Sequence, residues 1–206
     1  MRWMRAVAIV ACLLGGGLAQ PLAQARDTTV TCMGQPVTIA GTTESETITG
    51  TESNDVINGV GGTDHIRGLG GNDLLCQGAG WYGGIRGTEG NDVLLGSANY
   101  DDTLDGGPGN DTLYGFGTCC HVEQDLDGGP GSDVIYGGSE LEYIYGGEGN
   151  DRLYGRGNGD SDAVYGEGGN DLLVPGPGID EETNGGPGID RCVTQPEDKL
   201  VTECEK

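Results

Sequence analysis

The strongest constraint on this chain is a repeat of nine residues that runs from about residue 50 to residue 193. In each unit, six residues rich in Gly, Asn and Asp precede three residues with one large aliphatic side chain at their centre. The clearest copies read GGPGNDTLY at 106–114, GGPGSDVIY at 128–136 and GGEGNDRLY at 146–154. Repetition with a fixed period decides the architecture before single-residue propensities do, because every copy must adopt the same local structure.

One unit alone cannot bury its aliphatic side chain, because a six-residue turn and a three-residue strand have no second layer to pack against. Two successive units form one coil of about 18 residues, in which two short strands face each other. Stacked coils give two parallel sheets, so the sequence predicts an all-β solenoid whose core is two thin rows. The expected rows are Ile57, Leu75, Leu94, Leu113, Ile135, Leu153 and Leu173 on one sheet and Ile48, Ile66, Ile85, Leu104, Leu126, Ile144 and Val164 on the other.

The composition agrees with so thin a core. Hydrophobic residues make up 34% of the chain, which has a single Phe, while 43 of 206 residues are Gly without the every-third spacing of collagen. Burying one aliphatic side chain stabilises a protein by roughly 1.5–3 kcal/mol, whereas ordering the backbone costs roughly 1–2 kcal/mol per residue. With one buried aliphatic in each unit, we do not expect the chain to fold without further stabilisation.

The sixth residue of the unit, Asp in most copies, predicts a column of carboxylates. Turns one coil apart lie near the strand spacing of ~4.8 Å, and unscreened carboxylates at that distance repel each other. A hard divalent cation held by carboxylates and turn carbonyls converts the repulsion into a cross-link. Gly-Asn-Asp clusters are also good turn formers in which Asp acts as a local cap, but turn formation does not require Asp at the same place in eight copies.

The net charge also favours cations as partners. Lys and Arg number 10 against 33 Asp and Glu, which gives a formal net charge of -23. A field of this sign repels nucleic acid phosphates and anionic membranes. We therefore expect metal ions, and no nucleic acid, among the partners of the chain.

With the Gly-Gly-x-Gly-x-Asp-x-aliphatic-x pattern of these units, the chain resembles the RTX, or hemolysin-type, calcium-binding repeat family over residues 50–193. The resemblance implies a parallel β-roll, which is a right-handed β-solenoid of nonapeptide repeats. It also implies that several Ca²⁺ ions lie between the loops of successive coils, held by the sixth-position Asp and by backbone oxygens. Residues 26–49 and 194–206 have lost the repeat, and we expect them to form short N- and C-terminal caps.

Applied to this chain, the family pattern makes the two edges of the roll unequal. On one edge the units have no insertions, and eight carboxylates leave seven gaps for ions. These carboxylates belong to Asp55, Asp73, Asp92, Asp111, Asp133, Asp151, Asp171 and Asp190. On the other edge, insertions and a Gly at position 83 interrupt the series, and we expect only scattered or weak sites. The metal ligands expected there are Asp64, Asp102, Glu142, Asp162 and Asp180.

The first 25 residues have the layout of a secretory signal peptide. Arg2 and Arg5 precede an apolar run over 6–14, and Ala-Gln-Ala at 23–25 offers a cleavage site. A lipidated Cys12 or an uncleaved anchor is the alternative for this segment, and no later stretch is apolar enough to cross a membrane. We expect an extracellular protein that begins at Arg26 and carries 8 basic against 33 acidic residues, a formal net charge of about -25.

Cysteine usage agrees with export. Six cysteines follow Cys12, an even number suited to disulfides in an oxidising compartment, and they allow about 15 pairings. We favour Cys32 with Cys76 and Cys192 with Cys204, because each pair brackets one end of the repeats. The adjacent Cys119 and Cys120 either form a strained bridge or remain thiols.

Two functions remain open after this reading. The first is a secreted, non-enzymatic calcium-binding protein that folds on binding the ion. The second is a calcium-dependent adhesin or matrix protein, whose row of Tyr114, Tyr136 and Tyr154 meets a cell surface or polysaccharide. Catalysis has little support, because His65 and His121 are the only histidines and no hydrolase or metalloprotease motif occurs. Ice binding would need a regular Thr row, which the turns lack.

Overall fold

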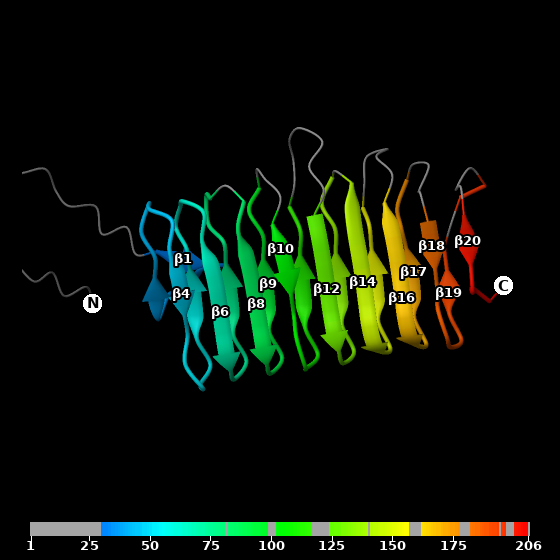
Figure 1. Ribbon diagram of the computed structural model, residues 1–206, viewed down its shortest axis with the longest axis horizontal. Coiled ribbons are helices and arrows are strands. Elements are labelled where there is room, and N and C mark those ends of the chain that lie inside the picture. The colour runs from blue at the N-terminus through cyan, green and yellow to red at the C-terminus, as the bar shows by residue number, and fades with distance from the viewer. Residues whose placement is uncertain are drawn as a thin grey trace, which may run out of the picture.

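The computed structural model describes residues 30–80, 82–98, 102–116, 124–139, 141–156, 162–177, 182–193, 195–196 and 200–205. The strands of these segments form an elongated stack of coils with two long parallel sheets, each of nine strands (Figure 1). No helix occurs in this part of the chain. None of its segments therefore forms an apolar helix of membrane-spanning length. The protein is an all-β parallel β-roll, as the repeat predicts.

The odd-numbered strands from β3 onward form one sheet, which we call the first sheet. Its strands are β3 (Ile39–Ala40), β5 (Val56–Asn58), β7 (Leu74–Cys76), β9 (Val93–Leu95), β11 (Thr112–Tyr114), β13 (Val134–Tyr136), β15 (Arg152–Tyr154), β17 (Leu172–Val174) and β19 (Arg191–Cys192). The even-numbered strands form the second sheet. These are β4 (Thr47–Thr49), β6 (His65–Gly70), β8 (Gly84–Glu89), β10 (Thr103–Asp105), β12 (Gln124–Pro130), β14 (Glu142–Gly149), β16 (Ala163–Gly169), β18 (Glu182–Asn184) and β20 (Val201–Thr202).

The core consists of one aliphatic side chain from each strand, stacked in register. Leu113 of β11 pairs with Leu94 and Ile135 on the neighbouring strands, and the second sheet repeats this pattern. The fourteen residues expected in the two rows form one buried cluster, with Ile39 and Cys192 packed against its ends. The prediction of both rows is confirmed, because the central residue of each three-residue strand points inward even where aliphatic residues flank it, as in β9 and β17.

Parallel pairing extends outside residues 50–193. Ile39 pairs with Ile57 at the start, and Thr202 pairs with Asn184 near the end. A small antiparallel hairpin, β1 (Thr31–Cys32) with β2 (Gln35–Pro36), precedes the first coil. Its Cys32 side chain is buried with Leu74 and Cys76 on the outer face of the first sheet.

Two disulfides lie at the two ends of the roll. Cys32 is bonded to Cys76, which ties the N-terminal hairpin to β7, and Cys192 of β19 is bonded to Cys204. Both pairings agree with the prediction from their positions around the repeats. Cys119 and Cys120 lie outside the described residues.

The turns fall on two edges, and only one of them is regular. The regular edge, at the bottom of Figure 1, carries the turns that lead from the second sheet into the first. The irregular edge, at the top, carries the connections from the first sheet back to the second, and the insertions of the sequence fall there. Unequal coil lengths are therefore absorbed on one edge, and the strands of the first sheet keep their register.

Close backbone stacking explains the Gly at the fourth position of the regular turns. A Cβ added to Gly131, Gly149 or Gly169 would lie 1.4 Å from the carbonyl oxygen of the equivalent Gly one coil earlier. Gly149 also has a φ of +143°, which L side chains rarely adopt. The high glycine content is thus a geometric requirement of coils that touch through their backbones.

Candidate metal centre

The expected Asp residues of the regular edge form a continuous column. The N–H of each Asp donates to the Oδ1 atom of the Asp one coil later, over distances of 2.6–2.9 Å. Seven such bonds run without a break from Asp55 to Asp190. From Asp73 onward, each of these residues is at most 3% exposed. A β-strand follows each Asp at once, so the ladder register fixes the spacing of the carboxylates.

The second carboxylate oxygen of this column is buried and accepts no hydrogen bond. The Oδ2 atoms concerned are those of Asp73, Asp92, Asp111, Asp133, Asp151, Asp171 and Asp190. A buried acceptor without a partner costs free energy comparable to a lost hydrogen bond, and a charged acceptor costs more. Seven consecutive turns therefore each contain a buried carboxylate oxygen that a bound cation would satisfy.

The first Gly of each regular turn lets two acceptors approach the same point. A Cβ added to Gly106 would lie 2.6 Å from both Asp111 Oδ2 and the carbonyl oxygen of Gly128. At Gly128, the same test gives 2.7 Å to Asp133 Oδ2 and 2.6 Å to the carbonyl oxygen of Gly146. The first Gly thus brings a carboxylate oxygen and a carbonyl oxygen close together, and a cation bound near them would offset the repulsion between the two acceptors.

Burial raises the pKa of the central carboxylates. Desolvation is the largest cause, opposed by the backbone N–H bond, and it brings the pKa of Asp92, Asp133, Asp151 and Asp171 to about 6. Desolvation brings the pKa of Asp111 to about 7, and charged neighbours add to the effect. The column is therefore electrostatically unfavourable at neutral pH when no cation is bound.

At the N-terminal end of the column, Asp55 behaves differently. Burial acts to raise its pKa, but hydrogen bonds from the hydroxyl and backbone N–H of Thr51 and from the hydroxyl of Thr38 outweigh burial and lower it. The Oδ2 atom of Asp55 thus has donors that the other members of the column lack.

These shifts predict an unusual pH dependence for the chelated protein. Carboxylates with a raised pKa in the folded state favour folding while protonated, so this contribution is full below about pH 4 and is lost as the pH rises through about 6 to 7. In EDTA, we expect more β-structure at pH 5 than at pH 7.5, where the carboxylates are ionised and the chain is largely unordered. Added calcium should reverse the order, because a cation needs the ionised carboxylates. Far-UV circular dichroism at both pH values measures this, and equal β-structure content in EDTA at the two pH values would contradict it.

The donor set of the column fits a hard cation. Within the described ranges, no three side chains of His, Cys, Asp or Glu gather at one point. A site between two coils would therefore combine sixth-position carboxylates with turn carbonyls, and such all-oxygen sets suit Ca²⁺, which takes about 6–8 oxygen ligands. The bound ion would neutralise the carboxylates and cross-link adjacent turns, which is a structural role.

The irregular edge carries a broken version of the same column. The Oδ1 atom of Asp64 accepts from the N–H of Glu46 at 2.9 Å, and that of Asp102 accepts from the N–H of Gly83 at 2.9 Å. The N–H of Glu142 donates to Asp162 Oδ1 at 3.2 Å. Of the expected residues on this edge, Asp180 lies outside the described residues.

Two glutamines explain the interruptions on the irregular edge. The amide of Gln77 donates to the Asp64 carbonyl and occupies the space that a side chain at Gly83 would fill, since a Cβ there would lie 1.7 Å from Gln77 Nε2. Gln124 is in register with Glu142 and is fully buried, so a neutral amide stands where the repeat has a carboxylate. Sequence reasoning missed both residues, because the insertions hide their place in the repeat.

Sequence reasoning also missed the groups at the ends of the regular column. Thr38 donates its hydroxyl to Asp55 Oδ1 at 3.1 Å, and Glu205 accepts the N–H of Asp190. Thr38 immediately precedes Ile39, which lies 18 residues before Ile57. That spacing is the signal that would have located the first coil.

The aromatic row stacks as expected on the outer face of the first sheet. The rings of Tyr114, Tyr136 and Tyr154 are parallel within 15°, with centroids 5.1 Å apart. Phe116 continues the stack from Tyr114 at 6.3 Å. Because the rings cover one another's faces, both faces of Tyr136 are blocked to a sugar ring. The structure thus favours cross-strand packing over a sugar-binding role for this row.

A β-roll whose glycine-rich turns bury a column of carboxylates defines a repeat protein of the calcium-binding type. The chain matches the family model of the RTX calcium-binding nonapeptide repeat at residues 40–75, 85–99, 98–117, 127–161, 141–173 and 156–181. The protein belongs to this family. No curated protein matches the chain significantly.

Proposed function

We propose that the protein is a secreted, non-enzymatic calcium-binding β-roll that folds when it binds several Ca²⁺ ions. The observation that carries this proposal is the row of buried Oδ2 atoms on the regular edge that have no hydrogen-bond donor. Membership of the RTX calcium-binding repeat family supports the choice of ion. The signal-peptide layout of residues 1–25 and the disulfides support export.

We assign the ions to the gaps between consecutive carboxylates of the regular column. The ligands are the sixth-position Asp residues from Asp55 to Asp190, together with turn carbonyls of the type found at Gly128 and Gly146. Asp64, Asp102, Glu142, Asp162 and Asp180 are proposed as weaker ligands on the irregular edge, where neutral amides interrupt the series.

Self-repulsion explains why folding should depend on the ion. Removal of the leader leaves a formal net charge of about -25, and the described residues contain a single ion pair, between Arg86 and Asp105. An expanded chain separates these charges, and bound Ca²⁺ neutralises part of them in the folded roll. Extracellular modules of this kind bind calcium with a Kd on the order of 10⁻⁴ to 10⁻³ M, so the exterior of the cell would trigger folding.

The test is a calcium titration of the mature chain from Arg26, followed by far-UV circular dichroism. In EDTA we expect a largely unordered spectrum, and with millimolar Ca²⁺ a cooperative change to β-structure. Mg²⁺ at the same concentration should not produce the change, because it demands a smaller octahedral site and dehydrates reluctantly. A protein that is fully folded in EDTA and unresponsive to Ca²⁺ would overturn the proposal.

A further inference from the structure

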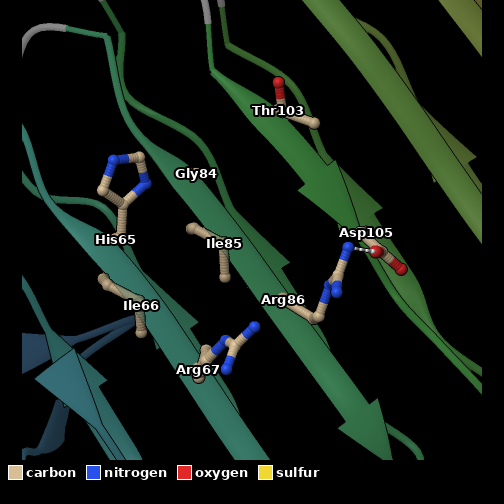
Figure 2. Close-up of a pocket in the computed structure, with 8 residues that line it drawn as sticks. All are labelled: His65, Ile66, Arg67, Gly84, Ile85, Arg86, Thr103 and Asp105. Carbon is tan, nitrogen blue, oxygen red and sulfur yellow. Dashed lines mark ion pairs between the residues drawn. The ribbon is translucent and has the colours of Figure 1, made fainter. Parts of the chain in front are cut away.

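A hollow of about 230 Å³ lies on the outer face of the second sheet, across β6, β8 and β10 (Figure 2). The side chains around it that can bind a ligand belong to His65, Arg67, Arg86, Thr103 and Asp105. These residues occupy positions 7 and 9 of their units, which point away from the core. The hollow is therefore separate from the carboxylate columns on the two edges.

The hollow contains a like-charge pair in a chain that is otherwise strongly acidic. Arg67 and Arg86 are direct register partners on β6 and β8. Like charges directly opposite each other destabilise a sheet. Nothing in the repeat requires Arg at these places, since the equivalent residue of β10 is Asp105. Such a local conflict is typical of a residue retained for binding.

Only one of the two guanidinium groups is neutralised. Arg86 Nη2 lies 2.6 Å from Asp105 Oδ2, as the dashed line in Figure 2 shows. On the other side of Arg67, the register partner is the uncharged Thr49. Within the part of the chain that the structure describes, no acidic side chain forms an ion pair with Arg67. Arg86 thus already lies beside Asp105 and near Asp127, the register partner of Asp105 on β12, whereas Arg67 is the cationic side chain of the hollow that remains for a ligand.

Gly84 supplies the space in the hollow. It lies in register between His65 and Thr103, and a Cβ there would lie 3.4 Å from His65 Nδ1 and 3.8 Å from the Thr103 carbonyl oxygen. Its φ lies outside the left-handed range. Neither the fold nor a close approach therefore demands glycine at this place, unlike the turn glycines. The missing side chain leaves room for a small ligand against the backbone of β8.

We propose that this hollow binds a uronate, with the sugar carboxylate on Arg67 and the sugar ring over Gly84. The planar guanidinium group matches a carboxylate through two parallel hydrogen bonds. The Thr103 hydroxyl and the His65 imidazole can exchange hydrogen bonds with sugar hydroxyls. A cavity of about 230 Å³ is smaller than drug-sized pockets of roughly 300–1,000 Å³, so it suits one ring.

Charge selects a carboxylate over more highly charged anions. Arg67, the guanidinium group of the hollow without an ion-pair partner among the described residues, can pair with one carboxylate, while the chain as a whole carries a formal charge of -23 and repels polyanions at longer range. A sulfate or phosphate dianion would bring a second negative charge that Arg67 does not match, close to the carboxylates of Asp105 and Asp127. The site therefore favours a singly charged sugar acid of a polysaccharide over nucleic acid.

The test is a chemical-shift titration of the calcium-loaded mature protein with methyl glucuronoside. Three other ligands serve as controls. Methyl glucoside has the sugar without the charge, acetate has the carboxylate without the sugar, and sulfate has two negative charges instead of one. We expect methyl glucuronoside to bind most tightly and to shift the signals of β6, β8 and β10. The Arg67→Gln and Gly84→Thr variants should each bind at least about tenfold more weakly, the first by losing the charge and the second by filling the space.

The control variant is Arg152→Gln, which removes an arginine from the outer face of the first sheet. It should bind methyl glucuronoside as the parent protein does. An unchanged circular dichroism spectrum in calcium shows that each variant is folded. Equal binding of methyl glucoside or acetate, tighter binding of sulfate, or full affinity in Arg67→Gln would each overturn the proposal.

Discussion

Replacing Gly149 by alanine should abolish stable folding of the central coils. The added Cβ would lie 1.4 Å from the Gly131 carbonyl oxygen, and the backbone has a φ of +143°. Backbone atoms of a stacked coil cannot give way as a flexible side chain can, so relief requires the coils to separate. We expect the free energy of unfolding in saturating calcium to fall by at least about 3 kcal/mol. Urea denaturation followed by circular dichroism measures this change.

A second glycine provides a matched control for this experiment. At Gly84, an added Cβ meets nothing closer than 3.4 Å and points to the outside of a strand. The Gly84→Ala variant should change the free energy of unfolding by no more than about 0.5 kcal/mol. Equal stabilities of Gly84→Ala and Gly149→Ala would show that the coils do not stack through their fourth-position glycines.

The second large effect is expected for Asp133→Asn in the middle of the carboxylate column. Asparagine keeps an oxygen that can accept the N–H of Asp111, a bond of 2.6 Å in the structure, but it removes the charge. If Asp acts only as a local cap, the substitution should have little effect. If Asp133 is a metal ligand, the calcium concentration at the midpoint of folding should rise by about tenfold or more.

A substitution at Asp125 serves as the control, because it also removes one negative charge but does not alter the carboxylate column. Asp125 lies on the exposed face of β12, away from the column. Asp125→Asn should fold at the calcium concentration of the parent protein, or slightly below it because the net charge is smaller. If Asp125→Asn and Asp133→Asn fold at the same calcium concentration, the carboxylates of the column are not calcium ligands.

The core could be predicted residue by residue because the repeat leaves no choice. The central one of the three strand residues is aliphatic in nearly every unit, whatever its neighbours are, so the period alone placed Leu113 beside Ile135. The disulfides followed from a simpler argument, since Cys32 with Cys76 and Cys192 with Cys204 bracket the ends of the repeats. In both cases, the spacing along the chain determines the neighbours in space.

The features that could not be predicted from the sequence depend on how coils of different length align with one another. Gln77 and Gln124 fall in units with insertions or altered residues, and only the strand register shows that they interrupt the second column. Thr38 and Glu205 lie outside the recognisable repeat, although they complete the regular column. The Arg67 and Arg86 pair is likewise visible only when β6 is set beside β8.

The positions of the two disulfides determine where the rod can begin to come apart. In a one-dimensional stack, a terminal coil has a single neighbour, so fraying normally starts at an end. Here Cys32–Cys76 and Cys192–Cys204 fasten both ends covalently. Loss of calcium would therefore unfold the central coils first. The two disulfide-linked ends would remain as folded coils from which the stack can refold.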